Sequence, residues 1–455
     1  MRLHSIGLTN FRGFAKRDIA LHPEFNLIIG ENGAGKTSVL EALSVALGGW
    51  LQSFPGTDRR SIRKRDIRRI EQIINSRARS LSQFPVVVDA VGTFEINGLN
   101  SSAGSQRFSW TRSLESETGR TKSAETRSLK SFARMSSDAV QSGACITLPV
   151  IRYFGAGRLW EPVRSSDRDH PRRSAHMGEE SAAPDTQIEM NNPFYGYRMS
   201  VDKRANPSDL LRWIEEERRN EIDLEENSPA LGLVYAAIRS MLPELEEVRF
   251  ELRRKTLILR NESGTSLRFE DMSDGYRNVI SIAADLAIKI TMLNPHLGQA
   301  ALKETPGVVL IDEIDLHLHP RWQRRVCEDL RRTFPRVQFI CTTHSPFIVQ
   351  SLRTGEELIN LDGQETGDTA NLTLEEVAEG LMGVNHAETS QRYSKMKNTA
   401  RAFLEEMDRQ DLSSVQRFEA FKARMAEAIA PFADNPAYQA YLEMKLSKKA
   451  PRGIR

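Results

Sequence analysis

The sequence predicts an α/β fold, because three apolar, strand-like runs each end where chemically functional residues begin. The first run leads into a glycine-rich loop, GENGAGKTS at 30–38, which a helix-like segment follows. The second run, GVVLI at 307–311, ends in two adjacent carboxylates. The third run, VQFIC at 337–341, leads directly into TTHSP. Short buried strands that alternate with helical segments are typical of α/β proteins.

The loop at 30–38 fits a phosphate-binding loop in both pattern and context. Gly-x-x-x-x-Gly-Lys-Thr is complete at Gly30, Gly35, Lys36 and Thr37. Glycines let successive N–H groups converge on phosphate oxygens at a helix N-terminus, whose dipole favours negative charge. The lysine is expected at the β- and γ-phosphates, and the threonine hydroxyl on Mg²⁺. The predicted nucleotide contacts are Asn32, Gly33, Ala34, Gly35, Lys36, Thr37 and Ser38.

The two carboxylates behind the second run are the expected metal and catalytic groups. In a phosphate-loop enzyme the first, Asp312, holds the magnesium ion, and the second, Glu313, orients and deprotonates the attacking water. Adjacent acids at the end of a buried strand are costly without such partners. His344 is expected to hydrogen-bond the γ-phosphate, although a core or surface histidine explains that position equally well on its own.

Residues 274–290 carry apolar side chains at helical spacing, which predicts a buried helix with Ser273 at its N-cap. The motif MSDGYR stands where this helix begins. A helix N-terminus of small and polar residues can present N–H groups to an anion. An ordinary capped helix is the alternative interpretation.

Composition sets the class of protein. The chain has 455 residues, 39% of them hydrophobic, and a net charge of +2, so it can bury a large core and has no overall basic field. Its three cysteines show no metal-ligand spacing, which fits reduced thiols. The sequence has no apolar run of 18 residues and no signal-peptide pattern. A soluble, cytoplasmic protein without a membrane partner is expected.

Four parts are predicted along the chain. Residues 1–160 are expected to form an N-terminal ATPase lobe with the phosphate loop and a basic insertion, and 161–245 a mobile loop followed by a helical insertion. Residues 246–365 are the expected C-terminal ATPase lobe, and 366–455 a helical region. Within the first part, residues 2–29 read as two strands joined by a turn, and the Ser/Thr/Gly-rich stretch that ends near residue 142 reads as loops or strand edges.

Two further patterns have competing interpretations. The basic tract at 59–79 could neutralise nucleic-acid phosphates, but Asp66 and Glu71 interrupt it, and a solvated helical face is the commoner explanation. His317 and His319 stand at i, i+2 beside a proline, and no zinc site is expected there.

The ordered set GENGAGKT, MSDGYR, LIDEIDLHLHP and TTHSP resembles the ABC-type ATPase heads of the SMC, RecF and OLD group, as does the opening LTNFRGF. RYFGAGRLW and YGYRMSVDKRANPSDLLRW are more narrowly similar to the PtuA ATPases of the Septu anti-phage system and to retron-associated ATPases. The resemblance implies an ABC-type P-loop ATPase head with a mixed sheet, a helical insertion and a helical C-terminal region.

In that family two heads sandwich two ATP molecules with Mg²⁺, so the resemblance implies that Ser273 and Gly275 contact the γ-phosphate of the partner chain's site. It also implies that Arg12 points toward the nucleotide, whereas a solvated turn residue is the alternative. Asp274 stands where many transporters have glycine, which predicts slow or regulated hydrolysis. Gln141 and Arg158 are candidates near the active site, and neither is assigned as a magnesium ligand.

The function implied is an ATP-binding and ATP-hydrolysing sensor or regulatory subunit of an anti-phage defence complex, which controls a partner nuclease. An HNH-type nuclease or a retron component is the expected partner, with nucleic acid as a further ligand and head-to-head dimers as the unit of a homo-oligomer. A RecF-like DNA-binding repair ATPase is the alternative. A transporter subunit is disfavoured by the long insertion, an SMC tether by the missing heptad arms, and an OLD-type nuclease by the absence of an acidic metal centre in the sequence.

Overall fold

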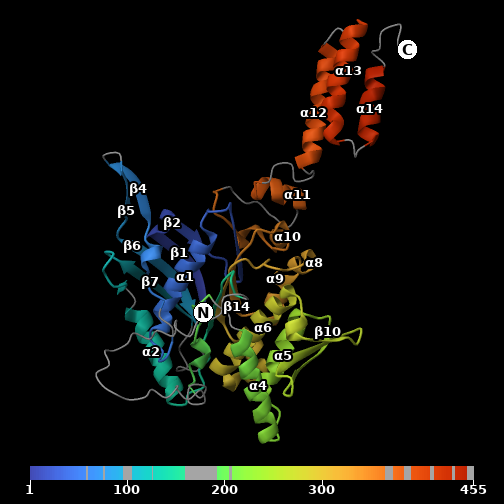
Figure 1. Ribbon diagram of the computed structural model, residues 1–455. Coiled ribbons are helices and arrows are strands. Elements are labelled where there is room, and N and C mark those ends of the chain that lie inside the picture. Colours follow the sequence, from blue (N-terminus) through green and yellow to red (C-terminus); the bar gives the residue numbers. More distant parts are fainter. Residues whose placement is uncertain are drawn as a thin grey trace. The chain divides into compact units, whose positions relative to one another are not determined.

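The computed structural model (Figure 1) describes residues 1–57, 60–74, 77–95, 105–124, 127–158, 192–203, 207–363, 372–383, 391–409, 414–432 and 436–447. The chain divides into two compact units, Met1–Val377 and Ala378–Arg455. The four predicted parts remain a prediction, and the predicted mobile loop lies almost entirely outside the described residues.

A five-stranded parallel sheet forms the centre of the first unit. Its strand order is β15-β3-β14-β13-β9, and every neighbouring pair is parallel. The strands are β3 Phe25–Ile29, β9 Val150–Phe154, β13 Gly307–Ile311, β14 Val337–Thr342 and β15 Leu358–Asn360. All residues of β3, β9, β13 and β14 are buried, as expected for parallel strands covered on both faces. The predicted α/β class is confirmed.

A five-stranded antiparallel sheet packs beside it, in the order β2-β1-β6-β7-β8. The strands are β1 Arg2–Phe11, β2 Phe14–Ala20, β6 Val86–Phe94, β7 Gln106–Leu114 and β8 Lys122–Ala124. Parallel and antiparallel strands therefore occupy separate sheets. The expectation of two strands within residues 2–29 was wrong: β1, β2 and β3 all lie there, because the chain reverses at Arg12, whose φ is 49°.

Helix α1, Lys36–Leu51, contacts strands of both sheets. Nearly all of its side chains are buried, including every residue from Val39 to Leu51. A helix that is apolar on all sides is stable only when it is covered on all sides. The phosphate loop therefore opens into a helix that is buried on nearly all sides.

The Ser/Thr/Gly-rich stretch before residue 142 was expected to form loops or strand edges, and a helix was not predicted there. It contains β7, β8 and a helix, α2 Arg127–Gln141, which buries Leu129, Phe132 and Ala133 against α1 and β7. The many serines concealed this helix because its apolar residues cover a single narrow face.

The described residues of the first unit contain further helices. They are α4 Pro207–Asp223, α5 Pro229–Met241, α6 Asp274–Leu293, α7 Ala301–Glu304, α8 Pro320–Gln323, α9 Val326–Thr333, α10 Pro346–Val349 and α11 Leu374–Glu376. Ser228 caps α5 by accepting from the Leu231 N–H. A small antiparallel sheet consists of β10 Leu245–Glu251, β11 Thr256–Asn261 and β12 Ser266–Arg268.

The second unit is helical, as predicted. It contains α12 Gln391–Arg409, α13 Val415–Ile429 and α14 Pro436–Ser447. Their apolar side chains form one cluster around Phe418, Phe421 and Leu442. Among the helices of the described residues, none combines the length and apolar character needed to cross a bilayer.

Candidate nucleotide-binding site

Three segments converge at the carboxyl edge of the parallel sheet. The phosphate loop follows β3, and Asp312 and Glu313 follow β13. Thr342 ends β14, which lies between these two strands, and Thr343 and His344 follow it. Ligand sites of open α/β sheets form at this edge, because the strand ends and helix N-termini meet there.

The glycines of the loop adopt backbone conformations that other residues rarely reach. Gly33 and Gly35 have φ values of 93° and 100°, and Gly35 is the N-cap of α1. A Cβ atom on Gly35 would stand 2.6 Å from the Phe14 ring of β2. These positions require glycine, so the backbone turns tightly enough for its N–H groups to point at one anion.

Lys36 lies inside the loop. Its Nζ donates to the carbonyl oxygens of Gly30 at 2.7 Å and Glu31 at 3.0 Å. Burial lowers its pKa, and the nearby carboxylates Asp362, Asp312, Glu313 and Asp315 oppose that by raising it. The ammonium is thus a partly buried cation among acids.

Thr37 and Asp312 are in direct contact. The Thr37 hydroxyl lies 3.0 and 3.2 Å from the two Asp312 carboxylate oxygens, and the Thr342 hydroxyl donates to Asp312 at 2.6 Å. Among the described residues no cationic side chain forms an ion pair with Asp312, which is only 4% exposed. A hydroxyl beside an unneutralised carboxylate is an oxygen ligand set that suits Mg²⁺. The residues therefore fit this metal together with a triphosphate.

Glu313 has an unusual backbone. Its φ is 50°, a left-handed conformation that is uncommon outside glycine and that clusters at functional sites. Its N–H donates to the Thr342 hydroxyl at 2.8 Å, so the same hydroxyl orients both acids. The side chain is half-buried.

His344 is exposed at the end of β14. The residue before it, Thr343, donates to Asp315 at 2.6 Å, and Ser345 caps the following helix α10. The loop that carries the imidazole is therefore fixed, while the ring itself is accessible to a ligand.

Arg158 supports the acid pair from behind. It is 1% exposed, donates to the Asp312 and Glu313 carbonyl oxygens at 2.7 and 3.1 Å, and donates to the Asn278 side chain of α6 at 2.6 Å. Burial lowers its pKa to about 10, so it remains charged at neutral pH. Gln141, in contrast, is exposed at the last residue of α2.

Arg12 lies in an ionic cluster rather than in a solvated turn. Its guanidinium donates to Asp66 at 2.9 Å and lies 3.5 Å from Glu41 of α1. Arg60 bridges the same two carboxylates at 2.9 and 2.7 Å. Since Thr37 and Glu41 are one turn apart on α1, this cluster adjoins the site. The Arg12 guanidinium contacts carboxylates, so its predicted contact with the nucleotide stays a prediction.

Ser273 and Gly275 stand at the start of α6, as predicted. Ser273 is exposed at the N-cap and makes no side-chain cap hydrogen bond. A Cβ on Gly275 would lie 2.6 Å from the His317 carbonyl oxygen, so this turn packs directly on the segment after Glu313. No hydrogen bond joins Ser273 to the phosphate loop within the described ranges.

The basic tract is a β-ribbon, and the expectation of a helical face was wrong. After a short helical turn, β4 Arg69–Ile74 pairs with β5 Arg77–Ser82 as a two-stranded sheet. Ile73 is 82% exposed, so no core covers the ribbon there. Both strands carry arginines, and arginine alternates with another residue at the start of β5. A period of two favours a strand over a helix.

Three residues of the site were not predicted from the sequence. Thr342 orients both acids, Asn278 fixes Arg158, and Asp362 accepts a hydrogen bond from the Glu31 N–H at 2.9 Å. Thr342 has one signal that could have identified it, because it is a polar residue just beyond the strand predicted at 337–341, whereas no strand was predicted before Asp362.

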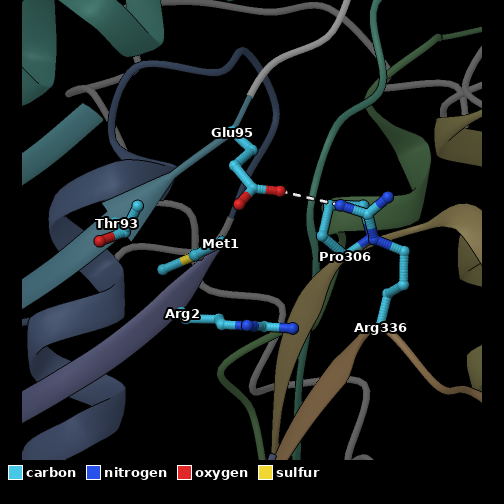
Figure 2. A pocket seen from close by; sticks show the side chains of 6 residues that line it. All are labelled: Met1, Arg2, Thr93, Glu95, Pro306 and Arg336. Atoms are coloured by element: carbon cyan, nitrogen blue, oxygen red, sulfur yellow. Dashed lines mark hydrogen bonds and ion pairs between the residues drawn. The ribbon is translucent and has the colours of Figure 1, made fainter. Parts of the chain in front are cut away.

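A small pocket lies at the opposite, amino edge of the parallel sheet. It is lined by Met1, Arg2, Thr93, Glu95, Pro306 and Arg336. Figure 2 shows Glu95 and Arg336 facing each other, and their ion pair is 2.8 Å long. At ≈ 20 Å³ it holds about one water molecule, and it contains none of the predicted site residues.

Comparison with known proteins gives matches at the level of sequence and of fold. The family model described as AAA domain matches residues 5–255, and a second, AAA ATPase domain, matches 205–349. The retron Vc95 probable ATPase of Vibrio cholerae serotype O1 biovar El Tor is 24% identical over 396 residues, covering 79% of this chain and 73% of its own. The Septu protein PtuA of Bacillus mycoides (strain KBAB4) is 43% identical over 98 residues, 22% of this chain and 13% of its own. The SMC head domain from Thermotoga maritima is 15% identical, with a TM-score of 0.39 over 79% of this chain and 94% of its own.

Proposed function

This chain belongs to the AAA domain family, and from that premise we propose that it binds and hydrolyses ATP as the regulatory subunit of an anti-phage defence complex. The observation that carries the proposal is the hydrogen bond between Thr37 and Asp312 at 3.0 Å. It joins the phosphate loop to the acid pair across an intervening strand, so one site contains both the triphosphate cradle and the hydrolytic groups.

Each site residue has a proposed role. Lys36 binds the β- and γ-phosphates, Thr37 and Asp312 hold Mg²⁺, and Glu313 orients and deprotonates the attacking water. Mg²⁺ neutralises charge that develops on the phosphates. The exposed His344 hydrogen-bonds the γ-phosphate and so reports whether it is present.

The defence role follows from the names of the relatives, one a retron ATPase and one a Septu protein. The partner is an HNH-type nuclease or a retron component, and nucleotide state in this subunit controls it. Co-expression and co-purification with any HNH-type nuclease encoded beside the gene, followed by cleavage assays with ATP, ADP and neither, test this control. Cleavage that is identical in all three conditions would count against it.

ATP binding is tested by calorimetry on Lys36→Ala. Loss of the nearest cation should remove measurable ATP binding, because the triphosphate charge is then unpaired in a partly enclosed loop. Lys422→Ala, which removes an exposed lysine of α13, is the control and should bind like the unaltered chain. Equal affinity in both variants would refute the assignment of the loop.

Head-to-head dimers complete the site, with Ser273 and Gly275 contacting the γ-phosphate held by the partner. The exposed Ser273, free of a capping bond, supports this arrangement. Ser273→Arg and Lys36→Ala should each abolish hydrolysis. Mixed dimers carry both lesions in one composite site and neither in the other, so mixing should restore part of the activity. Verified mixed dimers that stay inactive would argue against independent composite sites.

A RecF-like, DNA-binding repair ATPase remains a second candidate because the basic tract forms an exposed ribbon. Residues 60–83 contain eight arginines and lysines against two acids, and Asp66 is already neutralised by arginines. A two-stranded ribbon fits the major groove of B-DNA. Each phosphate contact removed should lower the slope of log K against log salt by about 0.9, so Arg79→Ala should reduce that slope. No duplex binding at 50 mM salt would eliminate this candidate.

A further inference from the structure

Asp362 is a carboxylate at the phosphate loop that lies outside every recognised motif. It follows β15, whose pairing sets Asn360 beside Ile29 at the end of β3. Its Oδ2 accepts from the Glu31 N–H at 2.9 Å. A Cβ atom on Gly30 would lie 3.3 and 3.4 Å from the two carboxylate oxygens, so the carboxylate covers the first glycine of the loop.

The carboxylate is held in place by its own turn. The Asp362 N–H donates to the Asn360 side chain at 3.0 Å. Arg17 of β2 donates to the Asn360 and Leu361 carbonyl oxygens at 3.4 and 3.3 Å. The antiparallel sheet therefore fixes the turn that carries this charge.

Asp362 and Lys36 contact the same two loop residues from different sides. Asp362 accepts from the Glu31 N–H, while Lys36 donates to the Gly30 and Glu31 carbonyl oxygens. The negative charge of Asp362 is therefore held at the same peptide as the ammonium that the triphosphate needs.

We propose that Asp362 is a positioning residue that anchors the Gly30–Glu31 peptide, and that its negative charge holds down the affinity of the phosphate loop for nucleoside triphosphates by opposing the polyphosphate charge. The inference rests on the proposed ATP site. The Asp362 carboxylate repels a bound triphosphate. The triphosphate also draws Lys36 toward its β- and γ-phosphates and away from Asp362. Both effects weaken ATP binding relative to a neutral residue at 362. Such tuning suits a subunit that senses ATP concentration rather than one that is always saturated.

The test is Asp362→Asn, which keeps an oxygen for the Glu31 N–H and removes the charge. At low salt the Kd for ATP should fall about three- to tenfold, which is the range that one like charge several ångströms away supports. The gain should rank ATP above ADP above AMP, because their charges fall in that order. It should also shrink toward unity as salt rises to about 0.5 M.

Glu356→Gln is the matched control. Glu356 is an exposed acid at the other end of β15, so the variant makes the same change in net charge far from the loop. Its nucleotide affinities should equal those of the unaltered chain. Asp362→Ala removes the hydrogen bond as well as the charge, and its gain in affinity should be smaller than that of Asp362→Asn.

Several outcomes would overturn the inference. One is an unchanged or weaker ATP affinity in folded Asp362→Asn, and another is a gain that is equal for ATP and AMP and insensitive to salt. A gain of the same size in Glu356→Gln would also refute it. If the unaltered chain and Lys36→Ala bind ATP equally, the proposed function itself fails, and this inference fails with it.

Discussion

Two buried carboxylate clusters adjoin helix α1, one turn apart, and they differ in what neutralises them. Asp312 contacts α1 through Thr37 and receives its hydrogen bonds from the Thr37 and Thr342 hydroxyls. Glu41, on α1 itself, and Asp66 are instead paired with the guanidinium groups of Arg12 and Arg60.

The partners indicate what each cluster is for. Hydroxyl groups satisfy hydrogen bonds but leave the negative charge of Asp312 in place, ready for a hard cation. Guanidinium groups cancel the charge, so Glu41 and Asp66 are scaffolding that ties the β1–β2 turn and the basic segment to α1. The kind of donor around a buried acid thus separates a candidate metal site from a structural ion pair.

The largest expected effect belongs to Glu313→Gln. Removing the proposed general base should lower ATP hydrolysis by about 10²- to 10⁴-fold, while ATP binding persists, because the amide cannot accept the proton from water. Phosphate release and calorimetry measure the two quantities. Unaltered turnover would remove Glu313 from the mechanism.

Asp66→Asn should be the most damaging change to stability. It leaves the buried Arg60 charge and the partly buried Arg12 charge without a full counter-ion, and breaking a buried ion pair typically costs about 3–5 kcal/mol. Chemical denaturation measures the free energy of unfolding. Asp312→Asn is the contrasting variant: it should lose Mg²⁺-dependent hydrolysis but cost less stability than Asp66→Asn, because its hydrogen-bond donors are neutral hydroxyl groups. Similar losses of stability in both variants would break the distinction between the clusters.

Thr342→Val should have an intermediate effect. The variant preserves shape but removes the hydroxyl that donates to Asp312 and accepts from the Glu313 N–H, and unsatisfied buried groups cost about 1–3 kcal/mol. Hydrolysis should fall together with stability, since both acids lose their orientation. The exposed Thr354→Val serves as control, and a Thr342→Val protein with normal turnover would contradict the prediction.

Arg65→Ala should have the smallest effect. Its side chain is 51% exposed and lies 3.7 Å from Glu41, at the solvent side of the scaffold cluster. Exposed ion pairs contribute about 0–1 kcal/mol. A loss of stability as large as that of Asp66→Asn would mean that the cluster depends on its exposed Arg65 rather than on Arg12 and Arg60.

Much of the site could be predicted because its pattern is local. Gly35 must adopt a positive φ, Lys36 and Thr37 follow it directly, and Asp312 and Glu313 end an apolar run. The same local rules failed where the apolar periodicity was weak or ambiguous. Helix α2 was missed among serines, and the basic ribbon was expected to be helical, because a short arginine-rich stretch satisfies several periodicities at once.

The sequence by itself determined the phosphate loop, the acid pair, the buried strands and the start of α6, because each depends on neighbouring residues and on backbone conformation. Only the tertiary structure decided that Arg158 supports the acids from behind, that Arg12 joins Glu41 and Asp66, and that Asp362 covers Gly30. These contacts join residues separated by 29 to more than 300 positions. Arg158 and Asp362 reach their partners because parallel strands bring distant segments to one edge of a sheet, whereas Arg12 reaches Glu41 and Asp66 from the turn between the antiparallel strands β1 and β2. Spacing along the chain carries no information about such meetings, so their charges and hydrogen bonds can be identified only once the sheet has formed.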